Sequence, residues 1–194
     1  MEKQNQLNPY YIVGFVDGEG CFGLQFRKDI RHERTNSPTY YSWKAQFMIT
    51  AREDEKELFE KIKDYFNCGN VYNQKKNNIR QGDEIHYCVS SLDNLKNIIS
   101  PFFKKYHLHG KKRNDFDLWA EAIDIMHKNK KEKINISKGK RGFLKNPWSK
   151  EDLLKLLDIH SQMQKYKAKR PQGLKHINIA RDIHHQFHSD PDKK

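Results

Sequence analysis

The sequence predicts an antiparallel α+β fold built as a single domain. With 194 residues, of which 36% are hydrophobic and 12% aromatic, the chain suits one domain with a sizeable core. Segments whose apolar residues have helical spacing are each followed by two segments in which apolar and polar residues alternate, as in strands. The order helix, two strands, helix, two strands, helix and further helices argues against a doubly wound parallel fold. We expect the domain over residues 8–170 and a polar C-terminal tail over 176–194.

The first helix and the first two strands have clear boundaries in the sequence. Asn8 suits the N-cap and Pro9 the first helical position, and the glycines within 18–20 end the helix. Alternation then predicts strands over 21–29 and 41–50, with apolar residues on one face and hydrogen-bonding residues on the other. Two neighbouring half-buried strands with polar outer faces are therefore expected.

A second helix and a second pair of strands follow. Thr50 with Glu53 three positions later fits a capping box, which opens a helix with apolar spacing that runs to Phe66. Strands are predicted over 71–75 and 84–89, and these form a second hairpin.

The rest of the chain reads as helices. The spacing predicts one helix over 92–103, stopped or kinked near Pro101, and another over 111–126. A capping box at 149–152 opens a helix over 153–163. Residues 127–148 read as a basic linker.

Basic residues are concentrated in the second half of the chain. Residues 1–103 hold 14 Lys and Arg against 14 Asp and Glu, whereas residues 104–194 hold 23 against 11 and so carry the whole formal charge of +12. This excess, with aromatic residues interleaved, predicts a polyanionic partner. Nucleic acid is favoured over a membrane surface because no basic stretch has a continuous apolar face. The alternative for any one basic run is an ordinary solvated surface.

Several other classes are excluded or disfavoured. No apolar run approaches the roughly 20 residues of a membrane span, so no membrane partner is expected. The first six residues have neither signal-peptide nor transit-peptide character, which predicts a protein that works where it is synthesised. The three cysteines lack C-x-x-C spacing, which favours reduced thiols over a disulfide framework or a zinc knuckle.

The stretch that carries chemistry is Ile-Val-Gly-Phe-Val-Asp-Gly-Glu-Gly-Cys-Phe, residues 12–22. Gly14 and Gly18 are four apart on one helix face, where missing side chains let another helix approach closely. Glu19 lies at the negative end of the helix dipole, an unfavourable place for a carboxylate without a cation. A divalent ion removes that penalty, and oxygen ligands suit Mg²⁺. The alternative is an ordinary helix end with a solvated glutamate.

This stretch closely resembles the signature of the LAGLIDADG homing endonucleases, with matches at 14, 15 and 17–20. The resemblance spans most of residues 8–126. It implies the αββαββα homing-endonuclease core with an antiparallel DNA-binding sheet and additional C-terminal helices. The implied function is a site-specific endonuclease, intron-encoded, that makes double-strand breaks in a long pseudo-palindromic DNA target. The implied reaction is metal-dependent phosphodiester hydrolysis, with Mg²⁺ as the expected ion.

The resemblance assigns roles residue by residue. Glu19 corresponds to the acid that binds the catalytic ion, beside the backbone carbonyl of Gly18, and Lys111 to a basic residue near the scissile phosphate. Because only one copy of the motif is present, a homodimer is implied, with Gly14, Gly18 and Asp17 at its interface. An isologous dimer predicts a target with approximate two-fold symmetry.

A twisted antiparallel ribbon fits the major groove of DNA, so the outward strand faces are the candidate base readers. These candidates are Gln25, Arg27, Asp29, Ser42, Lys44, Gln46, Tyr72, Gln74 and His86.

One departure from the family pattern bears on activity, because Ala51 stands where single-motif relatives often carry a glutamine that organises active-site water. It favours an alternative: a nuclease-inactive relative that binds RNA as an intron maturase or DNA as a regulator. The implied location is the site of synthesis, which is a chloroplast or mitochondrion for an organelle gene and otherwise the prokaryotic cytoplasm.

Overall fold

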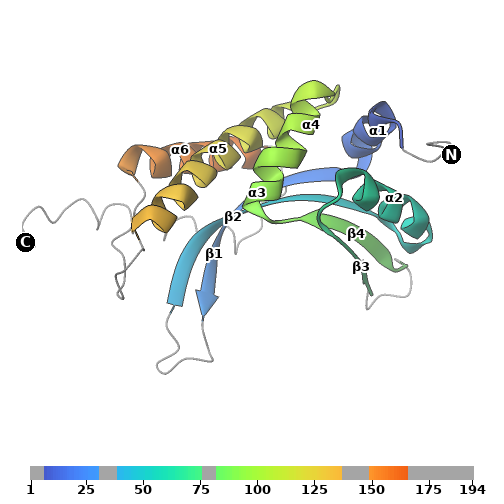
Figure 1. The fold of residues 1–194 in the computed structure, drawn as a ribbon, viewed down its shortest axis with the longest axis horizontal. Coiled ribbons are helices and arrows are strands. Elements are labelled where there is room, and N and C mark those ends of the chain that lie inside the picture. The colour runs from blue at the N-terminus through green and yellow to red at the C-terminus, as the bar shows by residue number, and fades with distance from the viewer. Residues whose placement is uncertain (1–6, 31–38, 76–81, 137–148, 166–194) are drawn as a thin grey trace, which may run out of the picture. The chain divides into compact units, whose positions relative to one another are not determined.

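The structure is a computed structural model that describes residues 7–30, 39–75, 82–136 and 149–165 (Figure 1). The predicted α+β class and the predicted alternation of helices with strand pairs are confirmed. The elements are, in order, α1 (Pro9–Glu19), β1 (Gly20–Ile30), β2 (Thr39–Arg52), the 3-10 turn η1 (Glu53–Glu55), α2 (Lys56–Phe66), β3 (Asn70–Gln74), β4 (Glu84–Val89), α3 (Leu92–Asn94), the π-helical turn η2 (Leu95–Ile99), α4 (Ser100–Lys105), α5 (Lys112–Ile136) and α6 (Lys150–Gln164).

The four strands form one sheet in the order β1-β2-β4-β3, and β4 is antiparallel to both of its neighbours. The second hairpin is therefore present as predicted. Ile49, Tyr87 and Val89 point to the buried face of the sheet. The helix α2 packs against β3 and β4 on that face (Figure 1).

The described residues group into two compact units. Unit one lies within residues 1–23 and 45–123, and unit two within residues 24–44 and 124–194. None of the helices among the described residues combines the length and apolar character that a membrane crossing requires.

The core of unit one is built around an aromatic side chain of β1. The Phe22 ring lies 5.2–5.4 Å from the rings of Phe47, Phe103, Phe116 and Trp119, so one residue joins β2, α4 and α5. The indole N–H of Trp119 donates to a β1 carbonyl at 3.2 Å. Aromatic pairs at this separation stabilise a core beyond the area that they bury. The strand that follows α1 is thereby fixed in place.

Unit two has a smaller core. Within it, the Trp43 ring lies 5.3 Å from the Phe26 ring and 5.9 Å from the His160 ring of α6. The buried Asn129 side chain of α5 donates to the Asp152 carboxylate of α6 at 3.1 Å.

Two of the three predicted N-caps are confirmed. The Asn8 side chain accepts the Tyr10 N–H at 2.9 Å, and Ser149 Oγ accepts the Asp152 N–H at 3.1 Å. These are local interactions between residues two or three positions apart, which is why the sequence reveals them.

The third predicted cap is wrong. Thr50 remains in β2, which continues to Arg52, and its hydroxyl lies 2.9 Å from Nδ1 of His86 on β4. The helix α2 begins only after η1. The Thr50 hydroxyl is therefore hydrogen-bonded to His86 on the neighbouring strand and does not cap a helix.

Two helices differ from the prediction. The segment predicted over 92–103, stopped or kinked near Pro101, stays helical to Lys105, and the π-helical turn η2 passes into α4 directly before this proline. α5 runs ten residues past the predicted end at Met126, so the predicted linker is wrong for residues 127–136. The remainder of that linker, 137–148, and the predicted tail, 176–194, lie outside the described residues.

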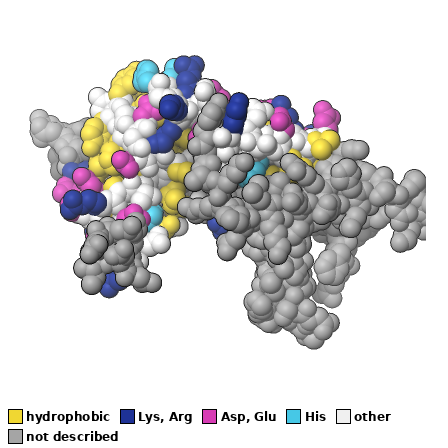
Figure 2. Space-filling view, turned by 180° about the vertical axis from the view of Figure 1, so that it is seen from behind, with side chains coloured by type: hydrophobic (Ala, Val, Ile, Leu, Met, Phe, Trp, Pro, Cys, Tyr) yellow, Lys and Arg dark blue, Asp and Glu magenta, His cyan; other side chains and the backbone are white. Residues whose placement is uncertain are grey.

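Most of the net charge also lies outside the described residues. The described segments hold 21 Lys and Arg and 20 Asp and Glu, against 37 and 25 in the whole chain. On the face shown in Figure 2, basic and acidic side chains of the described residues are interspersed. The basic excess that predicts a polyanionic partner therefore belongs mainly to segments whose placement is not described.

Candidate active site and nucleic-acid interface

The helix α1 buries one side in unit one and leaves the other side open. Ile12, Val13 and Val16 are buried. Gly14 and Gly18 are exposed, and a Cβ built on either of them meets no atom within 4 Å. The predicted face of small residues is therefore present, and no described residue covers it. We call it the open face of α1.

Gly20 is needed for a different reason. Its N–H donates to the Val16 carbonyl as α1 passes into β1. A Cβ at this position would lie 2.5 Å from Cγ1 of Val16 and 2.7 Å from its carbonyl oxygen. Only glycine permits this close approach, which places the last residue of α1 directly before the strand.

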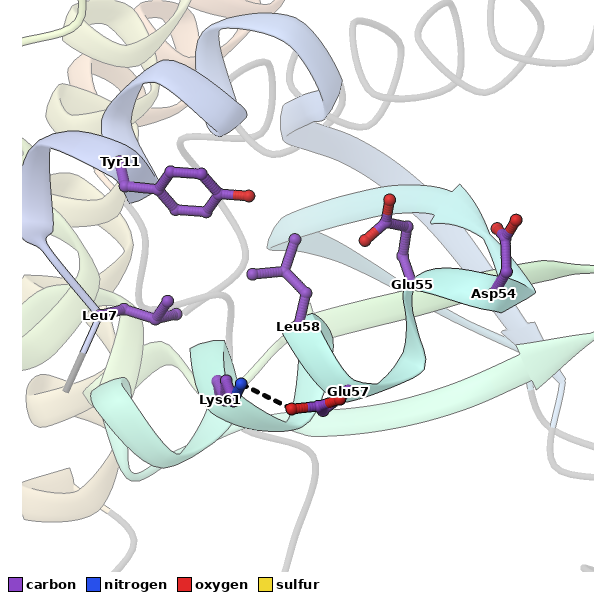
Figure 3. A pocket seen from close by; sticks show the side chains of 7 residues that line it. All are labelled: Leu7, Tyr11, Asp54, Glu55, Glu57, Leu58 and Lys61. Atoms are coloured by element: carbon purple, nitrogen blue, oxygen red, sulfur yellow. Dashed lines mark ion pairs between the residues drawn. The ribbon is translucent and has the colours of Figure 1, made fainter. Parts of the chain in front are cut away.

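The open face adjoins a pocket of about 340 Å³ between α1 and α2 (Figure 3). Leu7, Tyr11 and Leu58 supply its apolar part, and acidic residues of η1 and α2 line its rim. One of these, Glu57, pairs with Lys61 at 2.6 Å. Because Tyr11 is half exposed and three positions before Gly14, the pocket and the open face form one uncovered surface.

Oxygen atoms gather at the C-terminal end of α1. Glu19 is the last residue of the helix and is exposed. The ammonium group of Lys112 donates to the Asp17 carbonyl at 2.9 Å and to the Gly18 carbonyl. Burial lowers the pKa of Lys112, and the nearby carboxylates of Glu19 and Asp17 oppose this shift. A cation thus occupies the negative end of the helix dipole, as the charge distribution there requires.

The resemblance assigns the role near the scissile phosphate to Lys111, and the structure places the neighbouring Lys112 against the end of α1. Lys111 is exposed and precedes α5, whereas Lys112 is the first residue of α5 and turns back toward α1. Lys111 therefore lies in the turn before the helix, and only Lys112, at the helix start, reaches the carbonyl groups at the end of α1. The sequence contains the Lys-Lys pair but not the helix start that selects between its members.

Asp17, which the resemblance places at a dimer interface, directs its carboxylate to its own chain. Oδ2 accepts the His109 N–H at 2.8 Å, and Oδ1 accepts the Gly110 N–H at 3.2 Å. Both donors lie in the turn that leads into α5. Spacing in the sequence gives no signal for this contact, because the partners are more than 90 residues apart.

The donor set at the end of α1 fits part of a magnesium shell. The Glu19 carboxylate and the Gly18 carbonyl are two oxygen donors on consecutive residues. Mg²⁺ typically takes one or two carboxylates from a protein and completes its octahedron with waters and phosphate oxygens. No group of three or more His, Cys, Asp and Glu side chains within the described segments suits a metal. The remaining ligands would therefore come from water, nucleic acid or another chain.

The candidate base readers of unit two follow the predicted alternation. Gln25, Arg27 and Lys44 are exposed and Ser42 is half-buried, whereas the intervening Leu24 and Trp43 are buried. The Arg27 Nε–H donates to the Gln25 side-chain oxygen at 2.9 Å, so two of these side chains contact each other. Asp29 belongs to β1, but its side chain lies outside the described part of the chain.

The candidates of unit one share one face of the sheet. The register pairs Thr50 with His86 and His86 with Tyr72, so these three residues form a row across β2, β4 and β3. Gln74 is exposed two residues further along β3, and Gln46 is half-buried four residues before Thr50. Alternation along the strands therefore places these residues on one face of the sheet, as predicted.

His86 lies on that face but is not accessible. It is 5% exposed, because the Tyr72 ring stacks on it at 5.2 Å with an interplanar angle of 18°. Nδ1 is engaged by the Thr50 hydroxyl, and Nε2 lies 3.7 Å from a carboxylate oxygen of Glu84. The prediction that His86 contacts bases is corrected: it supports Tyr72, which is 45% exposed.

Ala51 lies on the opposite face of β2. It pairs with Ile85, a buried residue of β4, and is itself half-buried. The position where the family often has a water-organising glutamine is thus occupied by a methyl group that adjoins the core.

Known sequences of one endonuclease family are similar to the part of the chain that contains α1 and the sheet. The sequence pattern of the LAGLIDADG endonuclease family matches residues 12–123. The "Probable intron-encoded endonuclease 3" of Neurospora crassa is 33% identical over 122 residues, which are 62% of this chain and 20% of the relative. An "Uncharacterized 50.9 kDa protein in ND4 intron 1" of Podospora anserina is 33% identical over 126 residues, 64% of this chain and 25% of the relative.

Solved structures have the same fold. The homing endonuclease I-TnaI superposes with a TM-score of 0.64 at 22% identity, over 91% of this chain and 99% of that one. The LAGLIDADG homing endonuclease I-SmaMI bound to cleaved DNA gives a TM-score of 0.62 at 22% identity, over 92% of this chain and 50% of that one. The matched pattern covers more than half of the chain and runs from the motif helix into α5. The chain therefore belongs to the LAGLIDADG endonuclease family.

Proposed function

We propose that the protein is a homing endonuclease that cuts both strands of a long DNA site by metal-dependent phosphodiester hydrolysis. The observation that carries this proposal is the end of α1, where the exposed Glu19 adjoins the Asp17 and Gly18 carbonyl groups that accept the Lys112 ammonium group. The chain spans a fifth to about a third of the length of the curated relatives that it matches.

Three residues would perform the chemistry. Glu19 and the Gly18 carbonyl would hold a divalent ion, for which Mg²⁺ is the expected identity. A bound ion of this kind supplies positive charge that activates water and stabilises the leaving oxygen. Lys112 would bind the scissile phosphate and offset its developing negative charge. Its present hydrogen bonds to backbone carbonyls are replaceable, because a charged phosphate is the stronger partner.

A second copy of the chain would complete the site. The open face of α1 presents Gly14 and Gly18 with nothing above them among the described residues, and the half-exposed Tyr11 extends this face with apolar surface. Isologous packing of two α1 helices through this face would bring two Glu19 side chains together, one for each DNA strand. A two-fold dimer in turn implies a pseudo-palindromic target.

The uncovered sheet faces would read the DNA. Gln25, Arg27 and Lys44 are exposed donors or acceptors in unit two, and Tyr72 and Gln74 are exposed in unit one. A good bidentate contact with a base supplies about 1–3 kcal/mol of discrimination in the major groove. The basic excess of the chain would contribute phosphate contacts, which make affinity fall steeply with salt.

A second candidate function is nucleic-acid binding without cleavage, as an RNA-binding maturase or a DNA-binding regulator. The methyl group of Ala51, on the core side of β2, favours it, because no side chain there reaches toward water or phosphate. The intact Glu19 favours the nuclease, since a protein that only binds has no use for an acid that faces phosphate.

The names of the relatives also suggest a genetic setting. Because those names place them in introns, we propose that this chain is encoded within an intron as well. It would act in the compartment of its synthesis, which is a mitochondrion or chloroplast if the intron is organellar.

The experiment is cleavage of a plasmid library of intron-insertion sites by the purified chain, in Mg²⁺ and in excess chelator. Site-specific double-strand breaks in Mg²⁺ alone support the nuclease. Binding of RNA or DNA that is tight and salt-sensitive, with no breaks in any divalent ion, overturns the nuclease and favours the second candidate.

A further inference from the structure

The two acids of the motif have different surroundings although they are only two residues apart. Asp17 and Glu19 point about 200° apart around α1, because each helical residue turns about 100°. The Glu19 side chain is exposed, whereas Asp17 is half-buried and both of its carboxylate oxygens accept backbone N–H groups. A carboxylate held by two donors is fixed in position and in orientation.

The donors of these hydrogen bonds lie immediately before α5. His109 donates to Oδ2 at 2.8 Å and Gly110 donates to Oδ1 at 3.2 Å. The Gly110 carbonyl in turn accepts the N–H of Arg113 at 3.1 Å, within the first turn of α5. The Asp17 carboxylate therefore anchors the backbone from which this helix starts.

Gly110 fits closely against this carboxylate. A Cβ added to Gly110 would lie 3.1 Å from Oδ1 of Asp17, closer than most such contacts in proteins, and 3.5 Å from its Cγ, an ordinary van der Waals distance. The turn thus approaches Asp17 to a distance that a larger residue would disturb.

The side chain of Lys112 forms a second link between α5 and the end of α1. Lys112, the first residue of α5, extends its side chain back to the carbonyl groups of Asp17 and Gly18. A lysine side chain has four flexible bonds and loses considerable entropy when it is held in one place. Fixing the backbone two residues earlier limits the region that its ammonium group samples.

We infer that Asp17 is a positioning residue: through the backbone of His109 and Gly110 it sets the start of α5 and so delivers Lys112 to the end of α1. Asp17 itself touches neither phosphate nor metal in this account. The inference rests on the proposed function only for the role of Lys112 at phosphate, and the placement of Lys112 is testable without any cleavage.

The first test measures the reactivity of lysine amines in the full chain by acetylation and mass spectrometry. In the wild type, Lys112 is expected to react about tenfold more slowly than its exposed neighbour Lys111, the internal control, because its half-buried nitrogen is held against two carbonyl groups, and this protection outweighs the larger free-amine fraction that its lowered pKa gives. Asp17→Asn replaces one acceptor by an N–H donor and should bring Lys112 to within about threefold of Lys111. Asp117→Asn, at an exposed position of α5, is the matched control and should change nothing.

A second variant keeps the test decisive if Asp17→Asn does not fold. Gly110→Ala retains the carboxylate but pushes against it, and it should raise Lys112 reactivity as well. Equal reactivity of the two lysines in the wild type overturns the inference. So does continued protection of Lys112 in folded Asp17→Asn or in Gly110→Ala.

The second test is a double-mutant cycle on the single-turnover cleavage rate. Lys112→Met should slow cleavage by about 10²-fold, and Asp17→Asn should slow it by less. If Asp17 acts through Lys112, the double variant is no slower than Lys112→Met alone. Rate losses that multiply indicate a separate role for Asp17 and overturn the inference. A wild type that cleaves nothing refutes the proposed function and leaves the amine test to decide this inference.

Discussion

Replacing Gly14 by leucine should change two quantities in opposite directions: the stability of the single chain and the affinity between two copies. Gly14 is an exposed residue inside α1, and a Cβ there meets no atom within 4 Å. Leucine favours a helix over glycine by about 0.5–1 kcal/mol. For a chain of this length that gain raises the midpoint of thermal unfolding by about 1–4 °C. The isolated chain of Gly14→Leu is therefore expected to be slightly more stable than the wild type.

The proposed dimer should respond in the opposite direction. The open face of α1 would meet the same face of the second copy, so the interface of the variant contains two added leucine side chains, one from each copy. Overpacking a close contact costs about 1–3 kcal/mol, which gives about 2–6 kcal/mol for the pair. That range corresponds to a dimer dissociation constant raised by a factor of about 30 to more than 10⁴.

The assay is sedimentation equilibrium over a wide range of concentrations, combined with thermal unfolding at the lowest one. Asp64→Leu places the same side chain at an exposed position of α2 and is the control; it should associate like the wild type. The reasoning is refuted if Gly14→Leu associates as strongly as the wild type, or if the wild type is monomeric at every concentration.

Three further predictions concern unit one. Gly20→Ala should lower the free energy of unfolding by about 1–3 kcal/mol, because the new methyl group lies 2.5 Å from Val16; urea unfolding measures this, and no loss contradicts the packing described. Tyr72→Ala should weaken binding of the cognate site by about 1–3 kcal/mol at fixed salt, and unchanged binding excludes this sheet face as a reader. Burial raises the pKa of Tyr87 well above its usual range, so the folded state keeps this proton more tightly than the unfolded state, in which tyrosine has a pKa of about 10. The stability that this shift contributes is present below that pH and is lost as pH rises above it. Tyr87→Phe should abolish this alkaline loss while costing about 1 kcal/mol at pH 7 for the hydrogen bond to the Cys68 carbonyl. Urea unfolding of both proteins at pH 7 and at a pH above about 10 measures the free energy of unfolding. If it falls with pH as steeply in Tyr87→Phe as in the wild type, the prediction is contradicted.

Features set by neighbouring residues could be predicted from the sequence, and features set by distant ones could not. The caps at Asn8 and Ser149 depend on residues two or three positions away, and both are present. The capping box predicted at Thr50 is absent because its hydroxyl bonds a residue 36 positions later. α5 continues past its predicted end where Asn129 contacts Asp152 of α6, a contact that the local composition does not reveal.

In the candidate site, too, the features set by neighbouring residues could be predicted from the sequence, and those set by distant residues could not. The motif places Gly18 and Glu19 at the end of α1, and the alternation of the strands puts Tyr72 and His86 on the outward face. Which lysine of the pair faces α1 depends on where α5 starts, and the accessibility of His86 depends on the ring above it. Periodicity specifies the face of an element, but it does not specify what covers that face.

The central claim is that the end of α1 is a cleavage centre that depends on the Glu19 carboxylate. The most direct measurement is the single-turnover cleavage rate of a target site in Mg²⁺ for Glu19→Gln, with Asp64→Asn as a control that removes one exposed carboxylate from α2. We predict a rate at least about 10³-fold lower for Glu19→Gln, with DNA affinity in chelator and stability close to those of the wild type. A Glu19→Gln protein that cleaves as fast as the Asp64→Asn control would contradict the account.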